Sequence, residues 1–256
     1  MSHLYSCDLA HCDVKDSIMY YRPSLAANAA FLALFALSGI AHIAQGTITR
    51  KPYFLGAMIF GCTAEVIGYI GRLISWNNPF SLNGFLIGIC CITLAPAFFA
   101  AAIYFTLGDV VRHVSVDSSR IKPKTYAMIF IPCDLVSLIL QGTGGGLAST
   151  ASQNNKDVTK PTHVMVAGLA FQVATMAAFI AICLDYAFRV WKLQKRSGVT
   201  IAPHISKQKL AIFTAFFSLA ILTIFIRTVY RVIELAGGWT SKLYRTQTDY
   251  IVLEGV

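Results

Sequence analysis

Charged and amide side chains stand inside stretches of the sequence that are otherwise apolar. Glu65 and Arg72 are seven residues apart, and Asp134 and Gln141 have the same separation. On an α-helix this spacing places both side chains on one face, two turns apart. Ionisable groups at membrane depth cost several kcal/mol unless they are paired or hydrated. Such positions therefore indicate either buried ion pairs or a polar path for a ligand.

A second group of charges lies near the end of the last apolar stretch. Arg227 and Arg231 are one helical turn apart, and Glu234 follows three residues later. Two roles stay open for these charges. They either pair with Glu65 or Arg72 of the second apolar stretch, or they contact a transported ligand.

Other polar positions allow the same two interpretations. Asp134 follows Pro132, which frees a backbone carbonyl one turn upstream, and a structural and a functional role stay open for Asp134. His42 and Gln45 share one face of the first apolar stretch, where a histidine is more often a hydrogen-bonded core residue. Gln172 lies in the outer half of the fifth stretch.

The composition indicates that these residues lie on membrane-spanning segments. Of the 256 residues, 56% are hydrophobic and only 13% are charged, whereas a soluble domain has about 25% charged residues. Mean hydropathy is +0.62. These values exclude a disordered protein, a nucleic-acid-binding arm and a small disulfide scaffold. The net charge of +9 is expected in loops that face anionic lipid headgroups.

Six stretches have the roughly 20 mostly apolar residues that cross a membrane as a helix. The alternation typical of membrane strands is absent, so we predict an all-α polytopic transmembrane helix bundle. We divide the chain into an extracytoplasmic segment 1–23, a helical bundle 24–236 and a C-terminal segment 237–256. The predicted spans are Ser24–Gly46, Phe54–Ser75, Phe85–Gly108, Tyr126–Ala148, Val164–Trp191 and Leu210–Ala236.

The connecting loops differ in charge. Twelve lysines and arginines follow the odd-numbered spans, and six lie in the other loops and the termini. Because basic residues gather on the cytoplasmic side, we predict an N-terminus outside. Cys7 and Cys12 then lie in an oxidising compartment, and whether they pair stays open. No sorting motif is evident, and we expect the plasma membrane, with the vacuolar or another endomembrane as alternatives.

Several enzyme classes do not fit the sequence. The run Gly144–Gly146 lacks the Lys and Ser/Thr of a phosphate loop, so no site for ATP is evident; the run indicates close helix packing or an unwound helix end. Only His42 lies well inside a span, which argues against a zinc hydrolase. We therefore predict no enzyme activity, no catalytic residue, no metal and no cofactor.

Four motifs stand in order along the chain: Tyr21–Gly46, Ala64–Arg72, Gln141–Gly146 and Ile226–Trp239. Taken together they resemble those of the fungal lipid-translocating exporter family. The resemblance implies a seven-helix protein with an outside N-terminus that moves amphipathic lipids (sphingoid bases, phospholipids) or toxic small molecules, or confers resistance to them. A receptor-like lipid sensor that regulates membrane proteins is the alternative.

The resemblance also assigns candidate lipid-binding residues and partners. Membrane lipids and an amphipathic substrate are the expected partners, with a cytoplasmic protein at the basic loop Lys192–Lys209 and no nucleic acid. The family's seventh helix would begin near Tyr250, so we expect it to be truncated at Val256. With Asp134 added from its position in the span, the candidates are His42, Gln45, Glu65, Tyr69, Arg72, Asp134, Gln141, Gln172, Arg227, Tyr230, Arg231 and Glu234; Asn28 also matches the family pattern.

Overall fold

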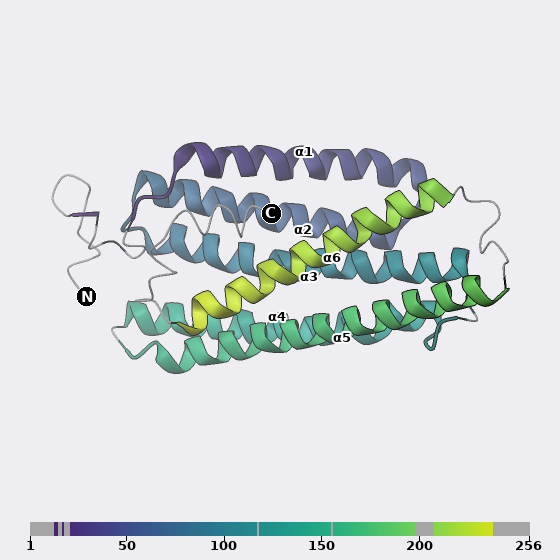
Figure 1. The fold of residues 1–256 in the computed structure, drawn as a ribbon. Helices are drawn as coiled ribbons and strands as arrows, with labels where there is room; N and C mark the ends of the chain where they lie inside the picture. The colour runs from purple at the N-terminus through teal and green to yellow at the C-terminus, as the bar shows by residue number, and fades with distance from the viewer. Residues whose placement is uncertain are drawn as a thin grey trace.

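Six long helices make up the bundle in the computed structural model, which describes Asp13, Val14, Ser17 and residues 21–116, 118–154, 156–197 and 207–237. Five of them run nearly side by side, and α6 crosses them obliquely (Figure 1). The described part of the chain contains no strand. The helices are α1 (Leu25–Thr49), α2 (Pro52–Asn77), α3 (Leu82–Val114), α4 (Pro123–Gln153), α5 (Thr159–Ser197) and α6 (Lys207–Ala236).

All six predicted spans are confirmed as helices long and apolar enough to cross a membrane, so the chain is an integral membrane protein. Each helix extends beyond its predicted apolar stretch. The reason is that a helix continues through the headgroup region until a cap or a turn ends it. The 39 residues of α5 would extend about 58 Å, well beyond the ~30 Å of hydrocarbon. At the start of α1, the Ser24 hydroxyl accepts a hydrogen bond from Ala27 N at 3.4 Å.

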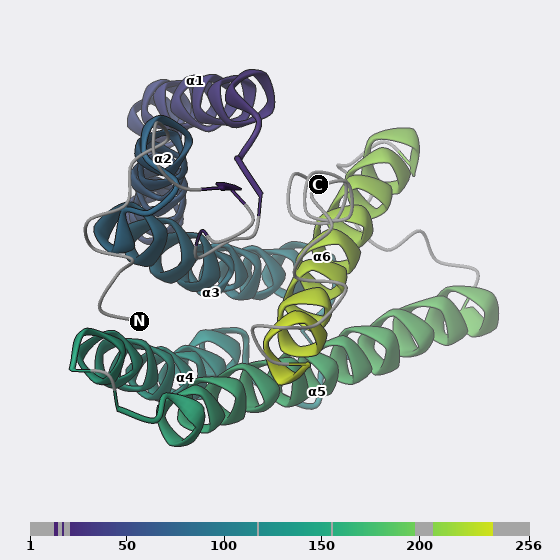
Figure 2. The ribbon, with the colours of Figure 1, turned by 90° about the vertical axis from the view of Figure 1, so that its left-hand side faces the viewer.

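Helix α3 lies at the centre of the bundle. Helices α2 and α4 pack on it, α1 packs on α2, α5 packs on α4, and α6 leans against α5 and α3 (Figure 2). Half of the most apolar stretch of α3 is buried, against 6% of the corresponding stretches of α1 and α6. These two helices therefore present most of their apolar surface to lipid.

Two kinds of contact hold the centre together. Where α2 crosses α3, a Cβ atom on Gly71 would lie 2.5 Å from the Gly88 nitrogen, so the backbones approach this closely only because both residues are glycine. Where α3 meets α4 and α5, the rings of Tyr104, Phe130 and Phe179 lie 4.7 to 5.3 Å apart. Aromatic rings at these distances add attraction beyond their buried area.

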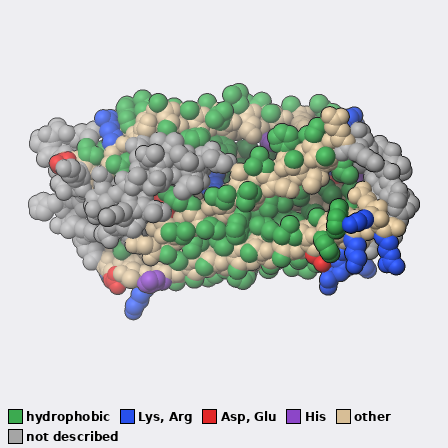
Figure 3. Space-filling model, in the orientation of Figure 1, with side chains coloured by type: hydrophobic (Ala, Val, Ile, Leu, Met, Phe, Trp, Pro, Cys, Tyr) green, Lys and Arg blue, Asp and Glu red, His purple; other side chains and the backbone are tan. Residues whose placement is uncertain are grey.

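Charged side chains gather at the two ends of the bundle, and hydrophobic side chains cover its middle (Figure 3). We call the end where α1, α3 and α5 finish the inner end, and the opposite end the outer end. At the inner end Asp185 pairs with Arg189 at 2.9 Å and Arg120 at 3.0 Å. The outside location of the N-terminus stays a prediction. Cys7, Cys12 and the predicted start of a seventh helix lie outside the described residues.

Candidate functional site

Glu65 of α2 and Arg227 of α6 form an ion pair within the bundle. Their side chains are 0% and 6% exposed. Arg227 Nη2 also donates a hydrogen bond of 3.3 Å to the backbone carbonyl of Ile92 in α3. That carbonyl has no helical partner because the residue four positions later, Pro96, lacks an N–H. Of the partners considered for the charges of the last span, Glu65 therefore pairs with Arg227, which joins α6 to two helices.

Arg72 bonds toward α1. Its Nε donates to Asn28 Oδ1 at 3.0 Å, and its Nη2 donates to the Tyr21 hydroxyl at 3.2 Å. Asn28 Nδ2 in turn donates to the Ser24 carbonyl at 2.6 Å. Arg72 is 7% exposed, and a buried guanidinium needs several acceptors to offset the loss of water. The outer ends of α1 and α2 are thereby joined.

The remaining predicted residues of α2 and α6 are also buried. Arg231 Nη1 lies 2.6 Å from Glu234 Oε2, an ion pair within one helix, and both side chains are 4% exposed. Tyr230 is buried on the same helix. On α2, Tyr69 is fully buried, with its ring stacked 5.5 Å from that of Phe31 in α1.

A separate polar seam joins α4 to α5. Gln141 Nε2 donates to Gln172 Oε1 at 2.8 Å. Three residues away on α5, the Thr175 hydroxyl donates to Asp134 Oδ1 at 3.3 Å, and the Tyr104 hydroxyl lies beside the same carboxylate. Interhelical hydrogen bonds of this kind contribute roughly 0.6 kcal/mol each in membrane proteins. The seam binds the second half of the bundle together.

The glycine run belongs to the same pair of helices. Residues Gln141–Gly146 lie inside α4, so the unwound helix end allowed by the sequence does not occur. A Cβ atom on Gly144 would lie 2.5 Å from the Met165 backbone nitrogen of α5, whereas Gly142 and Gly146 have nothing within 4 Å. Close packing of α4 on α5 is therefore the role of Gly144.

His42 and Gln45 lie elsewhere. The partly buried ring of His42 meets Phe54 edge-on at 6.1 Å between centroids. Gln45 is exposed and lines a cavity at the inner end. The twelve candidates therefore fall into several groups, and only Arg227 among them lines the groove described next.

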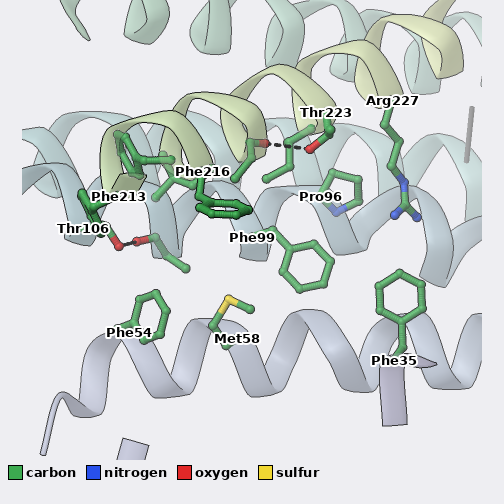
Figure 4. A pocket seen from close by; sticks show the side chains of 15 residues that line it. Phe35, Phe54, Met58, Pro96, Phe99, Thr106, Phe213, Phe216, Thr223 and Arg227 are labelled. Carbon is green, nitrogen blue, oxygen red and sulfur yellow. Dashed lines mark hydrogen bonds between the residues drawn. The ribbon is translucent and has the colours of Figure 1, made fainter. Parts of the chain in front are cut away.

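A groove of about 380 Å³ lies between the first three helices and α6. Phe216 of α6 faces Phe99 of α3 across it, Phe213 lies near Thr106 at one end, and Arg227 stands at the other end (Figure 4). Two wall threonines donate to carbonyls of their own helices, Thr106 to Ala102 at 2.8 Å and Thr223 to Ala220 at 3.0 Å. Between its ends the wall is therefore apolar. We call this cavity the aromatic groove; it is lined by Phe35, Phe54, Met58, Pro96, Phe99, Ala102, Ile103, Thr106, Phe213, Phe216, Phe217, Ala220, Thr223, Ile224 and Arg227.

The aromatic groove has a neighbouring cavity toward the inner end. A second cavity of about 530 Å³ shares Phe54, Thr106 and Phe213 with it. We call this second cavity the inner cavity. Along α6 the residues that line the two cavities extend from Lys209 to Arg227, which is about 27 Å at a rise of about 1.5 Å per residue. This length is close to the thickness of the hydrocarbon layer.

Sequence reasoning missed the aromatic wall and Pro96. A recognisable signal was the proline within the third apolar span, because such a proline frees a carbonyl that another side chain can bind. A second signal was the spacing of Phe213, Phe216 and Phe217, which places them on one helix face. Within the described residues no group of three His, Cys, Asp or Glu side chains is placed to hold a metal ion.

Comparison with known proteins decides the family. The family model described as RTA1 like protein matches residues 58–256. The chain belongs to this RTA1-like family. This result confirms the resemblance found in the motifs. No solved structure matches the chain significantly.

Three RTA1-like relatives come from Saccharomyces cerevisiae. The protein named sphingoid long-chain base transporter RSB1 is 30% identical over 261 residues, which cover 91% of this chain and 68% of the relative. Protein RTA1 is 25% identical over 270 residues, covering 94% and 82% respectively. Protein RTM1 is 28% identical over 200 residues, covering 78% and 62%.

Proposed function

We propose that this RTA1-like chain moves amphipathic lipids, such as sphingoid bases or phospholipids, or toxic amphipathic small molecules across the membrane and so confers resistance to them. The observation that best supports this proposal is the apolar groove along α6, which ends at Arg227 of the buried pair Glu65–Arg227. A lipid needs an apolar wall for its chain and polar groups for its head. The name of the relative RSB1, a sphingoid long-chain base transporter, supports the same class of substrate.

In this proposal the tail of the lipid lies against Phe99, Phe213 and Phe216. At the Arg227 end of the groove, a lipid with a cationic amine would pair with the Glu65 carboxylate in place of Arg227. A lipid with a phosphate would pair with Arg227 in place of Glu65. Each exchange gives the transported head an opposite charge but separates Glu65 from Arg227, so the displaced side chain needs another partner, such as the Ile92 carbonyl for Arg227. No phosphate loop is present, so movement is downhill, ion-coupled or driven by a partner.

The test is to block the groove with one bulky side chain. Ala220 lines the aromatic groove, while Ala215 is exposed on the same helix and lines neither cavity. We expect A220W to slow the transfer of a fluorescent sphingoid base across liposomes by at least about tenfold, the equivalent of 1.4 kcal/mol in the barrier. A215W adds the same side chain toward lipid and should transfer at nearly the unchanged rate.

Two results would refute the proposal. One is a transfer rate for the unchanged protein no higher than that of empty liposomes. The other is equal transfer by A220W and A215W, which would place any path elsewhere. Tight binding of the sphingoid base without transfer would favour the receptor-like sensor, whose effect would then be sought in cytoplasmic partners of the loop Lys192–Lys209.

A further inference from the structure

The inner cavity differs from the aromatic groove in the charges on its wall. It lies among the end of α1, the start of α2, the inner part of α3 and the start of α6. Four ionisable side chains line it: Lys51, Asp109, His113 and Lys209. The aromatic groove is thus apolar between its ends, and the neighbouring inner cavity has charged groups on its wall.

The charges on this wall do not cancel. Asp109 is the one carboxylate among the described lining residues, and it already has two cationic partners. Lys51 Nζ lies 2.5 Å from Asp109 Oδ2, and Arg112 Nη1 lies 3.6 Å from Asp109 Oδ1. Lys209 makes no ion pair with any residue that the structure describes. The wall therefore carries an excess of positive charge even when His113 is neutral.

The rest of the inner cavity is apolar. Phe105, Val110 and Leu210 stand beside the lysines, and Phe54 and Phe213 lead into the aromatic groove. Lys51 is half exposed and Lys209 is exposed, so water partly screens both charges. A ligand that fills both cavities must present a head at Lys51 and Lys209 and a chain toward Phe99.

We propose that the inner cavity binds the anionic headgroup, a phosphate or a carboxylate, of an amphiphile whose chain lies in the aromatic groove. The inference rests on the proposed function and adds the chemistry of the headgroup at the inner end. Lysine ammonium groups bind phosphate as point charges, and two of them border the cavity. A cationic head would face the net positive wall and would have to displace Lys51 and Arg112 from Asp109.

The test measures the binding of three probes of equal chain length to the purified 256-residue chain in detergent. The probes are radiolabelled hexadecyl phosphate, hexadecylamine and hexadecanol. We expect hexadecyl phosphate to bind at least about tenfold more tightly than hexadecanol. The double variant K51Q/K209Q should remove this preference and leave the affinity for hexadecanol unchanged. Lys51 is half exposed, so the variant should fold, and its thermal unfolding is checked beside that of the unchanged chain.

The matched control is K124Q/K192Q. It removes two exposed lysines that are also predicted on the cytoplasmic side and that line neither cavity. We expect it to keep the preference for hexadecyl phosphate. An equal loss in both double variants would overturn the proposal, because it would reflect net charge alone.

The remaining outcomes separate the two proposals. Equal binding of all three probes, blocked by A220W, leaves the proposed groove standing and overturns the anionic site. Failure of every probe to bind counts against both. Inorganic phosphate is added as a competitor, and displacement of hexadecyl phosphate by inorganic phosphate at equal concentration would show a site for free phosphate and overturn the lipid assignment.

Discussion

At the residue scale the buried charges are arranged in pairs. Glu65 has no exposed surface, and Arg227 meets both its carboxylate and the free carbonyl of Ile92. Taking either charge out of water costs several kcal/mol, and the partner offsets this cost only while both are present. The pair therefore tolerates loss of both charges better than loss of one.

Single and double neutral substitutions test this coupling. We expect E65Q and R227Q each to lower the free energy of unfolding by about 3 kcal/mol or more. The double variant should lose clearly less than the sum of the two. The measurement is thermal or denaturant unfolding of the purified chain in detergent.

The exposed pair at the inner end provides the control. Arg120 and Asp185 have side chains that are 65% and 37% exposed. R120Q should change the free energy of unfolding by less than about 1 kcal/mol, since water screens this pair. Additive losses in E65Q and R227Q would show that the two charges are not coupled.

At the element scale, glycine and proline determine how the helices contact each other. Glycine sets how closely two backbones approach, and proline frees a backbone carbonyl that a side chain of another helix can bind. Pro96 interrupts the hydrogen bonding of α3 and leaves a carbonyl for α6. Gly144 allows the backbone of α4 to touch that of α5 at Met165. Neither feature is visible in the hydropathy of its span, because both act through a neighbouring helix.

The glycine run allows a matched comparison within one motif. G144A would place a methyl group against the α5 backbone, and we expect a loss of about 1 to 3 kcal/mol in the free energy of unfolding. G142A and G146A have open space and should be neutral or gain up to about 1 kcal/mol, since alanine favours the helix. Equal stability of all three variants in detergent would contradict the packing role of Gly144.

At the scale of the whole molecule the charge distribution predicts the orientation. The connections that follow the first, third and fifth predicted spans, which include the inner ends of the helices, carry twice as many basic residues as the other connections and the termini. The inner end should therefore face the cytoplasm. The inner cavity, whose wall has a net positive charge, then lies on the side of the leaflet that is richer in anionic lipids.

Labelling of single cysteines tests this orientation. In a background without the seven native cysteines, K156C should react with an impermeant maleimide on intact cells, and K124C should react only after permeabilisation. Both lysines are exposed, so equal labelling after permeabilisation serves as the control. The reverse pattern would place the N-terminus inside.

The sequence by itself determined the features that depend on local composition. Six spans follow from runs of apolar residues, because crossing hydrocarbon needs only length and hydropathy. The buried charges of the second and last spans were also evident, since few charges occur inside such runs. The motifs were sufficient for the family, and the comparison confirmed it.

The tertiary structure alone decided which groups meet. Helical periodicity places a residue on a face but does not name the helix opposite. For this reason the sequence left open whether Arg227 pairs with a charge of the second span or contacts a ligand, and it kept the roles of Asp134 and the glycine run open. The groove has walls from α1, α2, α3 and α6, and its chemistry exists only where α6 crosses the others. A pathway along α6 therefore depends on the oblique packing of that helix, which no local pattern encodes.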